Sequence, residues 1–152
     1  MEKFNVMLVD DEHEFVKALA ERLEMRDLPP DKAYSGKEAL EKVARDEPDV
    51  MILDLKMPGI DGMEVLRQIR KAYPGVQVIM LTAHGTDKDE DEAMRLGAYA
   101  YLQKPVALDV LVKTMRQAYQ KKMEDVMVAA TFAEAGDFKT AVEIMEEDKK
   151  KK

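Results

Sequence analysis

The sequence predicts a doubly wound α/β domain with a five-stranded parallel sheet in the order 2-1-3-4-5. Short apolar runs alternate with amphipathic stretches of helical length, and the 152 residues suffice for one such domain. The runs are apolar without alternation, which is typical of strands that helices cover on both faces. The predicted strands are Phe4–Val9, Lys32–Tyr34, Val50–Leu53, Val76–Leu81 and Ala98–Leu102.

Amphipathic stretches follow each of these runs. In the first, Phe15, Leu19 and Leu23 recur at helical spacing, with charged residues on the opposite face. The second strand is weakly apolar and follows Pro29-Pro30, so we expect it at the edge of the sheet, where proline is best tolerated. The predicted helices are residues 13–26, 36–46, 62–73, 87–96 and 107–120.

Capping signals agree with these helix limits. Ser35-Gly36 opens the second helix, and Asp61 offers an N-cap with the Glu64 carboxylate three residues later. Gly97 stands where the fourth helix is expected to stop.

Composition excludes several classes of function. The formal net charge of -7 disfavours a DNA-binding face, and the absence of cysteine excludes disulfides, thiolate zinc sites and thiol nucleophiles. The apolar run within Met1–Val9 is too short for a signal peptide or a membrane span, so we expect a cytoplasmic protein. His13 and His84 lack a second histidine at ligand spacing and are not predicted to bind metal.

Polar residues stand where four of the predicted strands end. They are Asp10 and Asp11 after the first, Asp54 after the third, Thr82 after the fourth and Lys104 after the fifth. Ligands of open parallel sheets bind at the carboxyl ends of the strands, so these groups should share one site. Clustered carboxylates repel one another and need a cation, and Mg²⁺ prefers such oxygen ligands.

These groups suit phosphoryl transfer. Asp54 is the candidate nucleophile, and an aspartyl phosphate would be the product. Charge develops on the equatorial oxygens during transfer, and Mg²⁺, Lys104 and the Thr82 hydroxyl could each stabilise one of them.

From about Phe4 to Tyr119 the sequence resembles the response regulator receiver family, which has a flavodoxin-like fold. The resemblance rests on motifs at the predicted strand ends: Val9-Asp10-Asp11, the segment from Leu53 to Gly62, Thr82-Ala83 and Lys104-Pro105. It implies phosphorylation at Asp54 and a cis peptide bond before Pro105.

The same resemblance implies the remaining site roles. Asp11, Asp54 and the backbone carbonyl of Lys56 should coordinate Mg²⁺, with Asp10 assisting through a water molecule. Thr82 and Tyr101 take the positions of the switch residues.

The family comparison also implies partners. A histidine kinase or a histidine phosphotransfer protein would donate the phosphoryl group, and a downstream protein would read the changed conformation. The chain would then be a phosphoacceptor rather than an enzyme, with neither DNA nor a membrane as its target. Two alternatives are an unphosphorylated scaffold and a haloacid dehalogenase-like phosphatase, which would need an acidic residue where Lys56 stands.

The predicted domains are a receiver over residues 1–121 and a helical extension over 122–152. The extension should continue the fifth helix, turn at Gly136-Asp137 and form another short helix before a disordered lysine-rich end. Its apolar stripe could dimerise or fold back on the receiver. The face of the fourth helix, fifth strand and fifth helix is a second candidate for homodimer contact. The stripe residues are Val126, Ala129, Phe132, Phe138, Val142 and Met145.

Overall fold

The computed structural model describes residues 3–134 and confirms a five-stranded parallel sheet in the order β2-β1-β3-β4-β5. The strands are β1 (Val6–Val9), β2 (Pro30–Ala33), β3 (Val50–Leu53), β4 (Gln77–Thr82) and β5 (Ala100–Gln103). The helices are α1 (His13–Glu24), α2 (Gly36–Arg45), α3 (Gly62–Ala72), α4 (Asp87–Arg95) and α5 (Leu108–Glu134).

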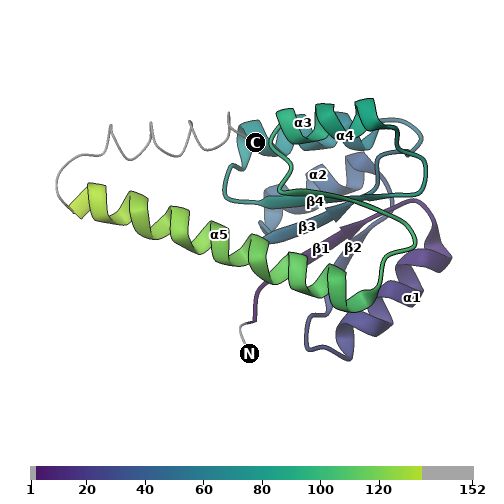
Figure 1. Ribbon diagram of the computed structural model, residues 1–152, viewed down its shortest axis with the longest axis horizontal. Coiled ribbons are helices and arrows are strands. Elements are labelled where there is room, and N and C mark those ends of the chain that lie inside the picture. Colours follow the sequence, from purple (N-terminus) through teal and green to yellow (C-terminus); the bar gives the residue numbers. More distant parts are fainter. Residues whose placement is uncertain (1–2, 135–152) are drawn as a thin grey trace.

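Helices cover both faces of the sheet (Figure 1). Alternate residues of each strand point to opposite faces, so Met51 packs with α2, α3 and α4, whereas Ile52 packs with α1 and α5. Each face therefore has its own apolar core. This explains why the inner strands are apolar along their whole length.

The edge strand β2 begins earlier than the sequence predicted. Pro30 is its first residue and pairs with Val6 of β1, and the strand ends at Ala33 rather than at Tyr34. Proline lacks an amide donor but is tolerated at this edge position. The sequence also predicted the start of β5 too early, at Ala98, whereas the strand begins at Ala100. The Ala98 amide donates a hydrogen bond to the Ala93 carbonyl and thereby closes α4.

Helix caps follow the sequence signals in most respects. The Ser35 hydroxyl accepts a hydrogen bond from the Glu38 amide at 3.1 Å, and the Asp61 carboxylate accepts one from the Glu64 amide at 2.9 Å. The Glu64 carboxylate binds Arg67 and Gln68 on its own helix, so it does not complete the capping box.

Helix α5 continues through residue 121 without interruption and reaches Glu134, the last described residue, well beyond the sheet (Figure 1). Phe4 stacks on Tyr119 with ring centroids 4.8 Å apart, and Lys122 Nζ lies 2.5 Å from Asp49 Oδ1. These contacts fix α5 to the amino-terminal edge of the sheet. The predicted turn and second helix lie outside the described residues. None of the helices within residues 3–134 is both long enough and apolar enough to cross a membrane.

Candidate functional site

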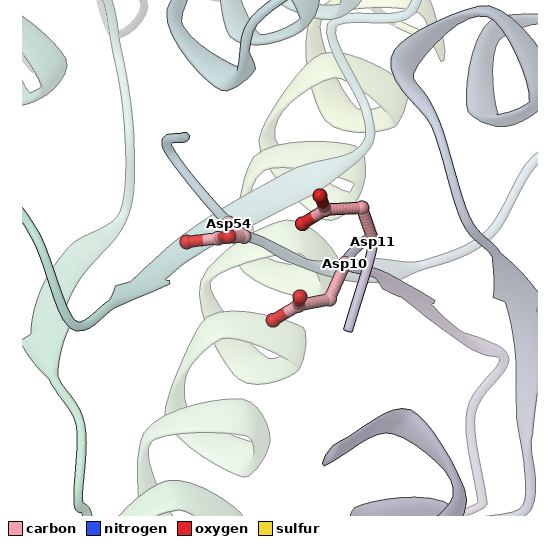
Figure 2. A group of neighbouring side chains, drawn as sticks. All are labelled: Asp10, Asp11 and Asp54. Carbon is pink, nitrogen blue, oxygen red and sulfur yellow. The ribbon is translucent and has the colours of Figure 1, made fainter. Parts of the chain in front are cut away.

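Three carboxylates meet at the carboxyl edge of the sheet (Figure 2). Asp10 and Asp11 follow β1 and Asp54 follows β3, and one oxygen from each lies within 4.8 Å of the other two. The sequence predicted this grouping correctly, because parallel strands bring their carboxyl ends to the same edge.

Backbone hydrogen bonds continue past the ends of the strands and fix the residues that carry these groups. The Asp10 amide donates to Ala33 at 3.1 Å, and the Asp54 amide donates to Val9 at 2.9 Å. The Lys104 amide likewise donates to the Thr82 carbonyl at 2.9 Å. The site therefore lies at the start of the loops, where backbone hydrogen bonds still hold these residues to the strand ends.

Two of the three acidic groups are buried, and Asp11 is half-buried. Asp10 is only 1% exposed and Asp54 only 5%. Burial is the main cause that raises the pKa of Asp54 above its ordinary value, and the neighbouring Asp10 charge raises it further. The Lys104 charge and hydrogen bonding from Thr82 and Leu55 oppose the shift in pKa. A further cation bound beside the cluster would stabilise the ionised carboxylates.

Lys104 faces this cluster. Its Nζ lies 2.6 Å from Asp10 Oδ2 and 3.7 Å from Glu12 Oε1, and it sits 3.9 Å from the centroid of the Phe15 ring. The peptide bond between Lys104 and Pro105 is cis, as the family resemblance implied. The sequence indicated Phe15 only as an apolar residue of α1. Its cation–π contact with Lys104 had no sequence signal.

Thr82 and Tyr101 lie on adjacent strands. Thr82 is fully buried at the end of β4, and its hydroxyl accepts a hydrogen bond from the His84 amide at 3.3 Å. Tyr101 of β5 packs against the core beneath α2, α3 and α4. Gly85, which the sequence did not single out, adjoins the Tyr101 hydroxyl.

The other predicted candidates lie around the site. Lys56 is exposed in the loop two residues after Asp54. His13 stacks on Tyr34 with ring centroids 4.1 Å apart. Among residues 3–134, the potential metal cluster contains the three aspartates and no histidine.

The donor set fits Mg²⁺. This ion binds through one or two carboxylates plus phosphoryl oxygens and waters, and it requires neither sulfur nor nitrogen. Burial raises the pKa of Asp54, and the charge of Asp10 raises it further, so a cation beside these groups would favour the ionised carboxylate. Asp10, Asp11 and Asp54 therefore offer the charge and the oxygen atoms that the ion needs.

Several known proteins are similar to this chain in sequence or in fold. Response regulator MprA of Mycobacterium ulcerans is 36% identical over 121 residues, which cover 79% of this chain and 52% of MprA. Transcriptional regulatory protein GlrR of Escherichia coli is 37% identical over 117 residues, which cover 77% of this chain and 26% of GlrR. The chain thus spans about half the length of MprA and about a quarter of GlrR.

A solved receiver domain protein from Clostridium thermocellum superposes with a TM-score of 0.74 and is 34% identical, covering 81% of this chain and 98% of its own. Residues 6–116 match the response regulator receiver domain family. That match contains all three aspartates and both predicted switch residues. The chain belongs to the response regulator receiver domain family, whose members are phosphoacceptor signalling modules rather than enzymes.

Proposed function

We propose that this protein accepts a phosphoryl group on Asp54 and signals through the resulting change of conformation. The observation that carries the proposal is the cluster of the buried Asp10 and Asp54 with the half-buried Asp11, which has the Lys104 ammonium beside it. Asp54 follows β3, which lies between β1, the strand before Asp10, and β4, the strand that ends in Thr82. It therefore occupies the centre of the site.

The donor is a phosphohistidine of a histidine kinase or of a histidine phosphotransfer protein. An Asp54 carboxylate oxygen attacks phosphorus and forms a new P–O bond while the P–N bond of the donor breaks. The electron pair of that bond returns to the imidazole nitrogen. The catalytic contribution of the protein is positioning and charge stabilisation, which suits a rigid site on strand ends.

Asp10, Asp11, Asp54 and the Lys56 backbone carbonyl would hold Mg²⁺. When bound, the ion neutralises negative charge on the phosphoryl oxygens and on the carboxylates. The Lys104 ammonium would bind a second phosphoryl oxygen. To do so it must share or leave its 2.6 Å contact with Asp10.

Thr82 and Tyr101 would transmit the signal. The Thr82 hydroxyl lies beside Asp54 and can donate a hydrogen bond to a new phosphoryl oxygen. That bond favours one arrangement of the β4–α4 loop, and Tyr101 packs against the same loop. The surface that changes would then comprise α4, β5 and α5, where a downstream protein binds.

The end of α5 would be an interaction element. Met123, Val126, Met127 and Val128 expose apolar surface beyond the point where Lys122 fixes the helix to the sheet. We propose that residues 122–152 form an extension to the receiver of residues 1–121 and that this arm contacts a second copy of the chain. The α4–β5–α5 face is an alternative homodimer surface.

Intact mass measurement with acetyl phosphate and Mg²⁺ tests the phosphoacceptor. One phosphoryl group should be added to the wild type, and peptide mapping should place it on Asp54. Asp61→Asn is a matched control, because Asp61 is exposed and asparagine caps helices as well as aspartate does. The proposal fails if Asp54→Asn gains the same mass as the wild type.

A further inference from the structure

The Tyr101 hydroxyl occupies a confined position. Its oxygen is buried, and within residues 3–134 it has no hydrogen-bond partner. Burial is the main cause that raises the pKa of Tyr101, and the charges of Asp89, Glu90, Asp54 and Asp87 raise it further. Because the buried hydroxyl makes no hydrogen bond, hydrogen bonding does not stabilise this position of the ring. Packing must therefore keep the ring there.

Gly85 provides the space that the hydroxyl fills. A Cβ atom at residue 85 would lie 1.4 Å from the Tyr101 hydroxyl oxygen and 2.8 Å from its Cζ atom. It would also lie 3.0 Å from the Thr82 methyl carbon. We call the space between Gly85 and this methyl group the hydroxyl slot. Any residue larger than glycine would fill the slot.

The backbone at Gly85 does not itself require glycine. Among residues 3–134, the glycines with positive φ are Gly59 at 77° and Gly97 at 103°, and Gly85 is not one of them. An alanine at residue 85 could adopt the same backbone conformation, because only its Cβ atom is in conflict. What demands glycine there is contact with the Tyr101 hydroxyl.

The slot adjoins both the site and the surface that would change. Thr82, which forms one wall, hydrogen-bonds with Asp54, and its oxygen also accepts from the His84 amide in the same loop. Thr86, on the other side of Gly85, caps α4 through a complete capping box. A change in how Tyr101 fills the slot therefore reaches both Asp54 and the first turn of α4.

We propose that Gly85 is a positioning residue for Tyr101, because its lack of a side chain creates the slot that holds the ring inward against Thr82. This inference rests on the proposed function, since it gives the phosphorylation-dependent switch the residue that sets its inward state. A side chain at residue 85 displaces the ring outward. The phosphoryl chemistry remains intact, but its effect on the far surface is lost.

The test compares Gly85→Ala with the wild type in two measurements. Intact mass after acetyl phosphate and Mg²⁺ treatment reports the chemistry, and the chemical shifts of the Tyr101 ring and the α4 amides report the switch. Gly85→Ala should still gain one phosphoryl group on Asp54. Its Tyr101 ring shifts should differ from those of the wild type before treatment and should lose their response to beryllofluoride. A wild-type protein that gains no mass contradicts the proposed function, whereas an unchanged ring response in Gly85→Ala contradicts only this inference.

Gly75→Ala is the matched control. A Cβ atom there would lie 3.5 Å from Glu47 Oε1, which is ordinary van der Waals contact. This variant should keep both the mass gain and the ring response. If Gly75→Ala loses the response to the same degree, the effect in Gly85→Ala is a general consequence of glycine replacement, and the inference is wrong.

If Gly85→Ala alone does not fold, the same substitution can be tested in a Tyr101→Ala protein. Tyr101→Ala removes the ring, so adding Gly85→Ala to it should lower the melting temperature much less than it does in the wild type. Two neighbouring residues that conflict sterically show such non-additivity. An equal loss of melting temperature in both backgrounds would mean that residue 85 does not act through Tyr101, and the inference would fail.

Discussion

The Lys104 ammonium lies 2.6 Å from Asp10 Oδ2, and the two side chains are only 11% and 2% exposed. Their residues are separated by most of the domain, since Asp10 follows β1 and Lys104 follows β5. The pair links the end of the outer strand β5 to the acidic cluster. The single Lys104 charge contacts Asp10 directly and also acts on Asp54, so one cation faces three carboxylates.

Lys104→Met should destabilise the protein, because Asp10 would remain buried without its cation. Removing one partner of a buried ion pair typically costs about 3 kcal/mol or more of unfolding free energy. Urea unfolding at neutral pH measures this loss. Lys121→Met, which breaks a more exposed pair with Asp125 within α5, should cost only about 0.5 kcal/mol. Equal losses in the two variants would contradict the prediction.

Mg²⁺ should stabilise the wild type, because it compensates the three adjacent carboxylates. At ten times its dissociation constant, a ligand that binds only the folded state adds about 1.4 kcal/mol to the unfolding free energy. Thermal melts with Mg²⁺ and with excess chelator measure the difference. Asp11→Asn should abolish it, whereas Asp31→Asn, on the exposed side of β2, should keep it. Phosphorylation by acetyl phosphate that persists undiminished in chelator would contradict the proposed metal site.

Tyr101 should ionise above the ordinary pKa of tyrosine. Because burial raises its pKa in the folded state, the unfolded chain loses this proton first as pH rises. The contribution of protonated Tyr101 to the unfolding free energy is therefore fully present below about pH 10 and is lost as pH rises through the folded pKa. Absorbance titration of the wild type minus Tyr101→Phe isolates this tyrosinate. A difference curve centred at or below the pKa of free tyrosine would refute the prediction.

Deletion of residues 123–152 should convert a dimer into a monomer if the α5 extension is a homodimer arm. Exposed apolar residues such as Val126 and Met127 would supply the contact. Light scattering at several protein concentrations gives the solution mass. The double variant Val126→Lys/Met127→Lys tests the same surface without shortening the chain. A monomer before and after deletion, with a lowered melting temperature, would favour an extension that covers its own receiver.

Most of the site could be predicted because it depends on topology. Once the strands are placed and known to be parallel, the positions after their ends share one edge of the sheet, so Asp10, Asp54 and Lys104 come together whatever their separation in sequence. The weak second run after Pro29-Pro30 predicts that β2 lies at an edge, which fits the observed strand order. No detail of side-chain packing is needed for either conclusion.

The contacts of Phe15 and Gly85 could not be predicted in this way. Whether Phe15 faces Lys104 depends on rotamers and on the approach of α1, which apolar spacing alone does not determine. Gly85 looks like an ordinary loop glycine in the sequence, and its role arises only from where the Tyr101 ring lies. The start of β2 was missed because Pro30 has no strand signal of its own.

The long α5 gives this protein a lever. Lys122 and Tyr119 hold the helix against the sheet, and residues 123–134 extend roughly 18 Å further at the rise of an α-helix. A tilt of about 10° around this fulcrum would carry Glu134 through roughly 3 Å, whereas the residues next to Lys122 would barely move. A small tilt of α5 caused at the phosphorylation site would thus produce a displacement that grows with distance along the helix. A partner bound near Glu134 would therefore undergo a larger displacement than residues close to the site.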